Sequence, residues 1–196
     1  MWRTVAQFAI VIAMYGATAT AAERSLSGQL LVATSEMKDP RFAEAVIYLV
    51  KHSDEGALGL IINKPVAKGS AGEVLKGFGI DNKGAKGEIV VHYGGPVGRE
   101  QGFILHSDEM VLESSTKVKD GIAMTTDPKM VQALALGKGP RQSLLIMGYA
   151  GWAPGQLEME IRADSWFTTG ADKSLVFGKD TEKTWRRAMD KRQIPL

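Results

Sequence analysis

Residues 45–63 read AVIYLVKHSDEGALGLIIN, two apolar runs separated by a cluster of turn-forming residues. The first run, Ala45–Lys51, is rich in the β-branched and aromatic residues that favour strands. Gly56 in the turn can adopt a positive φ, and the second run, Ala57–Asn63, follows it directly. We therefore predict a β-hairpin with a longer loop, which Pro65 brings to an end. Because both runs are almost entirely apolar, we expect these strands to be covered on two faces.

Strand signals on both sides of this hairpin outnumber the helical ones. Most of them fall in pairs joined by short turns, which is typical of antiparallel sheets. The chain is therefore predicted to be a single α+β domain with a largely antiparallel sheet. The further predicted strands are Gly28–Thr34, Glu88–Tyr93, Gln101–His106, Ser114–Val118 with Ile122–Thr125, Ser143–Tyr149, and a last hairpin of Trp166–Thr169 with Ser174–Phe177.

Three or four short helices complete the predicted domain. The clearest one has Asp127 as its N-cap, Pro128 at its first position and Gly137 just past its end. Ser70 and Glu73 have the spacing of a capping box, in which each side chain bonds to the other residue's backbone. The other predicted helices are Ala71–Lys76, Gly155–Ile161 and Thr181–Met189.

Composition and charge exclude several classes of protein. The chain has 196 residues and a formal net charge of +2, which is ordinary for one soluble domain. Nucleic-acid binding requires a concentrated basic surface, which a nearly neutral chain disfavours. Cysteine is absent from the sequence, so disulfides, thiolate nucleophiles and zinc–cysteine sites are excluded.

Residues 1–22 have the features of a secretory signal peptide. Arg3 is followed by a mostly apolar run, Val5–Tyr15, and then by small residues of the A-x-A form that signal peptidases recognise. We expect cleavage near Ala21-Ala22, a folded domain over residues 23–196, and a location in the periplasm or elsewhere outside the cytoplasm. The alternatives are an uncleaved membrane anchor, since Thr4–Ala22 carries no charge, or a buried helix in a cytoplasmic protein.

The common catalytic and cofactor motifs are all incomplete. Gly137-Lys138 is followed by glycine where a P-loop needs serine or threonine, and Gly77-Phe78-Gly79 lacks the third glycine of a dinucleotide fingerprint. Lys68 stands where a nucleophile elbow needs its first glycine, which favours the capping role for Ser70. The sequence therefore predicts no catalytic residue, no cofactor and no metal ligand.

Histidines are the remaining candidates for chemistry. His52, His92 and His106 each lie at or near the end of a predicted strand, where they could meet at a metal ion or act as acid and base. Their spacing favours instead separate, hydrogen-bonded imidazoles at strand ends. Glu158 and Glu160 are expected on different faces of their helix, as parts of a solvated surface.

A glycine-rich segment and the tryptophans are the remaining candidates for binding. Gly94–Gly98 reads GGPVG, whose amides could bind an anion, although a tight structural crossover is the favoured interpretation. Trp152, Trp166 and Trp185 could line a ligand groove or fill the core. The candidate ligand-binding residues are Gly94, Gly95, His52, His106 and Trp152.

Three blocks of sequence together resemble the YqgE/AlgH family. In the first block these residues are Asp39-Pro40, Phe42, His52, Asp54–Gly59 and Asn63-Lys64-Pro65. In the second they are Gly94-Gly95-Pro96-Val97 and Gly102–His106. In the third they are Gly148-Tyr149, Trp152, Gly155–Glu158, Glu160-Ile161 and Trp166. The blocks occur in the family's order and span most of the chain.

The resemblance implies an α+β fold of coiled, partly antiparallel sheets with short helices. It implies no agreed catalytic residues, and members are often labelled transcriptional regulators. The predicted leader departs from the family pattern, because an exported protein cannot act directly on transcription. We therefore expect a non-catalytic binding or accessory module at the cell envelope, with a small molecule or an envelope protein as partner. The alternatives are a transcriptional regulator, as the label suggests, or a hydrolase that uses His52 or His106 with a nearby carboxylate.

Overall fold

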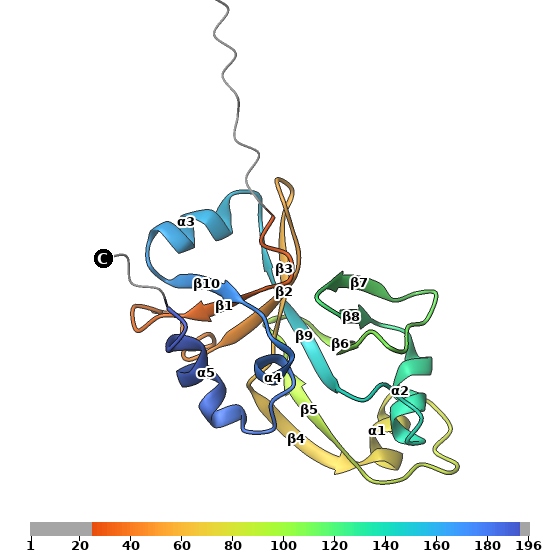
Figure 1. The fold of residues 1–196 in the computed structure, drawn as a ribbon. Coiled ribbons are helices and arrows are strands. Elements are labelled where there is room, and N and C mark those ends of the chain that lie inside the picture. Colours follow the sequence, from red (N-terminus) through yellow and green to blue (C-terminus); the bar gives the residue numbers. More distant parts are fainter. Residues whose placement is uncertain (1–24, 193–196) are drawn as a thin grey trace, which may run out of the picture.

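Strand β9 (Ser143–Trp152) organises the fold, because it pairs with three other strands. The computed structural model describes residues 25–192, so the predictions for residues 1–22 lie outside it. The C-terminal end of β9 pairs with β3 (Gly56–Ile61), and its N-terminal part lies between β6 (Val97–Ser107) and β5 (Glu88–Tyr93). As Figure 1 shows, β9 crosses from one half of the molecule to the other.

Two curled halves of sheet meet at β9, and of their strand pairs only β5–β9 is parallel. The α+β class and the largely antiparallel pairing are thereby confirmed. The longest run of paired strands is β10 (Trp166–Gly170), β1 (Gln29–Ala33), β2 (Val46–Ser53), β3, β9, β6, β8 (Ile122–Thr125) and β7 (Thr116–Lys119). Strand β4 (Pro65–Ser70) joins this run through β5.

The hairpin of β2 and β3 is buried on both faces, as predicted. Tyr48 belongs to the core cluster on one side of β2, whereas Ile47 and Leu49 belong to the cluster on the other. The turn is shorter than predicted, because Ser53 pairs with Gly56 and only two residues connect the strands.

Two other strand predictions were wrong. Pro65 does not simply end a strand, because it begins the edge strand β4, where a residue without an N–H is tolerated. The segment Ser174–Phe177 is not a strand, since residues 173–176 form the short helix α4 (Lys173–Val176). Asp172 caps this helix by accepting a hydrogen bond of 2.9 Å from the Leu175 amide. Strand β10 pairs with β1 instead.

Within the described residues there are five helices, one more than the upper prediction. The capping box is confirmed, because Ser70 Oγ accepts from the Glu73 amide at 3.2 Å and Glu73 Oε2 accepts from the Ser70 amide at 3.0 Å. Asp127 likewise accepts from the Lys129 amide at 2.9 Å. The other helices are α1 (Ala71–Gly77), α2 (Pro128–Ala135), α3 (Gln156–Arg162) and α5 (Thr181–Met189).

Three apolar clusters hold the sheet and helices together. One lies between the two halves of the sheet and includes residues of α4 and α5, such as Leu175 and Ala188. A second contains Trp152 and Trp166 together with Leu157 of α3. The third packs α1 and α2 against Ile104 and Leu145. Helix α3 is therefore fixed to the sheet by two buried indoles, and this placement builds the site described below.

We expect Glu109 to make stability depend on pH in the acid range. Its Oε1 accepts hydrogen bonds from the Arg141 amide at 2.5 Å and the Ser107 hydroxyl at 2.9 Å, which lower its pKa from 4.5 to about 2. A carboxyl whose pKa is lower in the folded state stabilises the fold above its unfolded pKa, and this stability is lost as the pH falls through the folded pKa. The urea midpoint of Glu109→Gln should lie below that of the wild type at pH 7, with the gap closing between about pH 4.5 and 2.

The control for this prediction is Glu113→Gln. Glu113 is exposed and its side chain forms no hydrogen bond within residues 25–192, so the substitution should leave the midpoint unchanged at every pH. A Glu109→Gln gap that stays constant from pH 7 to pH 2 would show that the carboxylate charge is not the source of the effect.

Candidate functional site

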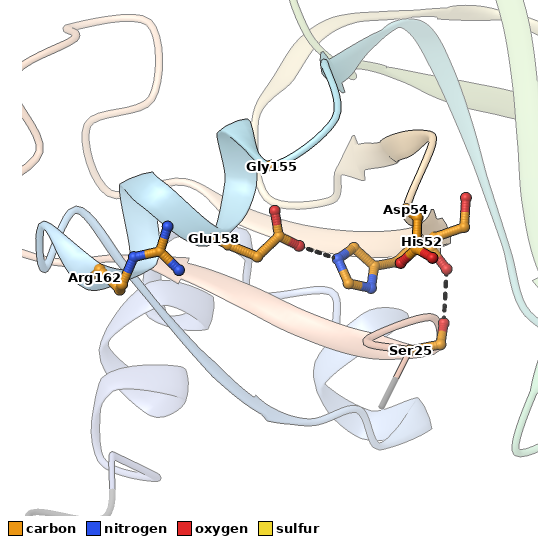
Figure 2. A pocket seen from close by; sticks show the side chains of 7 residues that line it. Ser25, His52, Asp54, Gly155, Glu158 and Arg162 are labelled. Carbon is orange, nitrogen blue, oxygen red and sulfur yellow. Dashed lines mark hydrogen bonds and ion pairs between the residues drawn. The ribbon is translucent and has the colours of Figure 1, made fainter. Parts of the chain in front are cut away.

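Helix α3 carries two glutamates that face different partners, and each partner lies at a pocket. The helix follows β9 through Gly155, whose positive φ of 73° allows the sharp change of direction. Glu158 reaches His52 at the end of β2, as Figure 2 shows. Glu160 reaches the indoles of Trp152 and Trp166. The prediction that both glutamates belong to a solvated surface was therefore wrong.

The first pocket surrounds His52 and has a volume of about 330 Å³. His52 Nε2 lies 2.6 Å from Glu158 Oε1, and His52 Nδ1 accepts a hydrogen bond of 3.1 Å from the Leu26 amide. Because an amide can only donate, Nδ1 must carry a lone pair, and the proton of the neutral ring then resides on Nε2 and is donated to Glu158. The lining residues are Ser25, His52, Ser53, Asp54, Gly155, Glu158 and Arg162.

Both nitrogens of His52 are therefore occupied by protein groups. Burial acts to raise the pKa of Glu158, but the hydrogen bond from His52, with weaker backbone and charge contributions, outweighs it and leaves that pKa below its ordinary value. Glu158 is consequently ionised at neutral pH. Ser25 adds a third tie by donating its hydroxyl proton to the His52 carbonyl at 2.9 Å (Figure 2). In this arrangement His52 joins the start of the domain, β2 and α3.

The second pocket, which we call the aromatic pocket, has a volume of about 530 Å³. Glu160 Oε2 accepts the indole protons of Trp152 and Trp166 at 2.9 and 2.8 Å. Its Oε1 accepts a hydrogen bond of 2.9 Å from the side-chain amide of Gln156. The two indoles meet edge to face, with ring centroids 6.2 Å apart. The lining residues are Glu36–Asp39, Arg41, Phe42, Pro96, Gly151, Trp152, Gln156, Glu160, Ala163, Ser165 and Trp166.

Charged side chains surround the opening of the aromatic pocket. Arg41 is held by Asp39, whose carboxylate oxygens lie 2.6–3.1 Å from the guanidinium nitrogens. This hydrogen bonding holds the pKa of Asp39 below its ordinary value. Lys38 is exposed and forms no salt bridge within residues 25–192. The pocket therefore combines an aromatic interior with a polar opening.

Gly94 and Gly95 allow the main chain to pass very close to the main chain of β9, beside this pocket. A Cβ on Gly94 would lie 2.2 Å from the Gly148 carbonyl oxygen, and one on Gly95 would lie 2.2 Å from the Tyr149 carbonyl. The Gly94 amide donates to the Met147 carbonyl at 2.8 Å and is not free to bind an anion. The geometry thus agrees with the structural crossover favoured from the sequence, and it positions Pro96 at the aromatic pocket.

The three histidines lie in different parts of the structure. His106 is fully buried on β6, with Nδ1 3.0 Å from the Ser107 carbonyl, so a substrate cannot reach it. His92 lies on β5, opposite Ile146, and burial lowers its pKa. His52 lies on β2, beside α3. In the part of the chain that the structure describes, no three histidine, aspartate or glutamate side chains are grouped as metal ligands would be.

Trp152 and Trp166 are sequence candidates that line the aromatic pocket, and Glu160 is the central residue that sequence reasoning missed. Its partners are 8 and 6 residues away along the chain, on β9 and β10, so helix periodicity alone could not reveal them. A usable signal was present, since a buried indole normally needs a hydrogen-bond acceptor. Trp185 lies elsewhere and donates to the Ala33 carbonyl at 2.7 Å.

The fold defines a class of α+β proteins in which one long strand joins two curled, mainly antiparallel halves of a sheet. A family model described as AlgH-like (DUF179) matches residues 30–196, so the chain belongs to the AlgH-like family. It is 44% identical to a UPF0301 protein of Methylococcus capsulatus, over 87% of this chain and 93% of the relative. A UPF0301 protein of Caulobacter vibrioides is 43% identical, over 85% and 86% of the two chains.

Two solved structures have a similar fold. The solution structure of AlgH from Pseudomonas aeruginosa has a TM-score of 0.73 and 33% identity, covering 89% of this chain and 93% of that one. The crystal structure of a protein from Corynebacterium diphtheriae has a TM-score of 0.67 at 22% identity, covering 86% and 88%, and shows likeness of fold alone. The resemblance inferred from the three sequence blocks is confirmed.

Proposed function

We propose that the protein is a non-catalytic binding module of the cell envelope whose ligand occupies the aromatic pocket. One observation carries this proposal. Residues from all three blocks of the family resemblance, far apart in the sequence, line this single pocket. They are Asp39 and Phe42 from the first block, Pro96 from the second, and Trp152, Gln156, Glu160 and Trp166 from the third.

The aromatic pocket has the size and rigidity that small-molecule binding needs. Its volume of about 530 Å³ falls in the range of known ligand pockets, which are mostly apolar with a few fixed polar groups. Glu160 holds both indoles in place, so little side-chain freedom remains to be lost when a ligand binds. The aromatic lining fits a small molecule with a flat, apolar face.

The hydrolase alternative has less support from the geometry. A general base needs a lone pair within reach of its substrate, and His52 offers none until the Leu26 amide is displaced. His106 is enclosed by protein. For the regulator alternative, the nearly neutral charge is the opposing argument, and salt-dependent DNA binding is the behaviour it requires.

Binding can be tested through the indole N–H signals in nuclear magnetic resonance spectra. A panel of indole, quinoline and naphthalene fragments is titrated into the purified protein. We expect at least one fragment to shift the signals of Trp152 and Trp166, which lie in the pocket, and to leave that of Trp185 unchanged. The same fragment should raise the melting temperature, because a ligand that binds only the folded state stabilises it.

Two outcomes would contradict binding at this pocket. Either no fragment moves the Trp152 and Trp166 signals, or the signal of Trp185 moves together with them, as it would for non-specific association. Turnover of ester, phosphate or peptide substrates that is lost in His52→Ala would replace the proposal with the hydrolase alternative.

The envelope location depends on the leader and needs its own experiment. No helix within residues 25–192 is long and apolar enough to cross a membrane. We expect fractionation of cells that produce the full chain to place it outside the cytoplasm, with its first residue near Glu23 by N-terminal sequencing. Recovery of the intact chain, beginning at Met1, from the cytoplasm would disprove this part of the proposal and leave binding at the aromatic pocket unaffected.

A further inference from the structure

A third pocket, on the side of the molecule away from α3, combines apolar walls with basic side chains. It has a volume of about 730 Å³ and lies among the paired strands β4 and β5, the start of β9 and the loop before α5. We call it the cationic groove. Its lining residues are Pro65–Lys68, Val90, His92, Arg141–Leu144, Phe177–Lys179 and Thr181.

The charges of the cationic groove are of one sign. Three basic residues, Lys68, Arg141 and Lys179, line it, and no acidic residue does. Lys68 is neutralised by Glu88 at 2.6 Å, but neither Arg141 nor Lys179 forms a salt bridge within residues 25–192. Arg141 and Lys179 are thus two exposed cations that no salt bridge within the described residues engages, in a chain that is nearly neutral overall.

The acidic residue next to Lys179 in the chain and the one hydrogen-bonded to Arg141 are already engaged. Asp180, next to Lys179, forms a salt bridge of 2.9 Å with Lys183. Glu109 accepts hydrogen bonds from the backbone amide of Arg141 and the Ser107 hydroxyl, and its charge attracts the Arg141 guanidinium without forming a salt bridge with it. An anion that entered the groove would not have to displace a carboxylate from Arg141 or Lys179.

The walls of the groove are apolar and partly exposed. Val66 and Val90 have exposed fractions of 63% and 37%, and they are two of the five large apolar residues that the described chain exposes. Leu144 and the half-buried Phe177 connect these walls to the core between the sheet halves. His92 also lines the groove, and because burial lowers its pKa it adds no positive charge at neutral pH. An apolar surface beside cations without salt bridges suits a ligand that has an apolar part and a negative charge.

We propose that the cationic groove binds a small amphipathic anion, with an apolar chain along Val66, Val90 and Phe177 and an anionic group held by Arg141 and Lys179. The hydroxyl and amide groups of Thr181 and Gln142 lie in the same lining and can complete the hydrogen bonding of that group. This site is separate from the aromatic pocket, and the two share no lining residue.

Isothermal titration calorimetry of the purified full chain tests this proposal with four matched probes below their micelle-forming concentrations. Decanoate and decyl phosphate carry both the chain and the charge, decanol carries only the chain, and inorganic phosphate carries only the charge. We expect the two amphipathic anions to bind at least about tenfold more tightly than decanol or phosphate, a difference of about 1.4 kcal/mol. Equal binding of decanol and decanoate, or binding of phosphate alone, would overturn the proposal.

Variants locate the binding. The double variant Arg141→Gln/Lys179→Gln should weaken decanoate binding about tenfold or more, because each exposed charge pair is worth up to about 1 kcal/mol. Val66→Asp should weaken it as well, by placing a negative charge on the apolar wall. The control, Lys117→Gln, removes an exposed charge that lines neither the cationic groove nor the aromatic pocket and should change nothing. Thermal unfolding of each variant verifies that the fold is retained.

A vesicle measurement separates a soluble ligand from a membrane. Only a small fraction of the protein should sediment with phosphatidylglycerol vesicles, and soluble decanoate should abolish this vesicle binding. Strong vesicle binding without binding of soluble decanoate would reject the small-molecule site in favour of a membrane-binding surface. Unchanged decanoate binding in the double variant would reject the assignment of Arg141 and Lys179.

Discussion

Gly95→Ala is expected to prevent folding or to remove most of the stability of the domain. A Cβ at residue 95 would lie 2.2 Å from the carbonyl carbon and oxygen of Tyr149 and 2.4 Å from the Ala150 amide nitrogen. These are main-chain atoms of β9, which is paired on both edges and cannot move aside without breaking its pairs with β3 and β6. Protein interiors are packed so densely that a backbone overlap of this size can be removed only by a costly shift of the main chain.

The expected loss is about 4 kcal/mol or more, which is a large share of the 5–15 kcal/mol typical of a folded domain. Urea unfolding followed by circular dichroism should show a greatly lowered midpoint or no cooperative transition. The matched control is Gly77→Ala at the end of α1, where an added Cβ meets nothing within 4 Å. Alanine favours helix over glycine by about 1 kcal/mol, so this variant should be as stable as the wild type or slightly more stable. A Gly95→Ala protein with wild-type stability would show that the β5–β6 crossover is not closely packed against β9.

Glu160→Gln is the second substitution expected to have a large effect, because it removes the carboxylate that both buried indoles use. A glutamine has one carbonyl oxygen and one NH₂ group. Whichever way the glutamine amide is turned, its NH₂ group faces another donor. That donor is either the pair of indole N–H groups or the side-chain NH₂ group of Gln156. The variant also loses the charge, and hydrogen bonds to charged groups are worth about 1.5–3 kcal/mol each.

We expect Glu160→Gln to lose about 2–4 kcal/mol of stability, which corresponds to a fall in melting temperature of roughly 5–15 °C for a domain of this size. The near-ultraviolet circular dichroism of the folded variant should also weaken, because Trp152 and Trp166 are no longer held in one orientation. Glu182→Gln is the control, since Glu182 is exposed on α5 and its side chain forms no hydrogen bond within residues 25–192. A Glu160→Gln variant that melts within 1–2 °C of the wild type would refute the view that this carboxylate fixes the pocket.

Local sequence rules predicted most of the elements but failed where two signals competed. The caps of α1 and α2 were correctly predicted because Ser70 and Asp127 bond to amides two or three residues away. At α4 the strand propensity of Leu175 and Val176 was overridden by the cap from Asp172 and by burial of both side chains. Strand β4 was missed because Pro65 usually marks an end, whereas at an edge strand it can mark a beginning.

The candidate site was only partly predictable, for a related reason. His52 and Trp152 were chosen by residue type, and both lie at pockets formed with α3. Their glutamate partners were assigned to the solvent because the sequence gives helical faces and does not say what lies against each face. The bond between His52 and Glu158 joins residues that are 106 positions apart.

The sequence by itself determined the class of the domain, the family and the two-sided burial of the central hairpin. These features depend on the pattern of apolar residues, on turn-forming residues and on helix caps. All of these act between residues that are close together in the sequence. The tertiary structure alone decided that Glu160 binds two indoles, that His52 is fully bonded, and that Arg141 and Lys179 line one groove. Such pairings arise when β9 brings distant segments together, and hydrogen bonds and charges act across space without regard to separation along the chain.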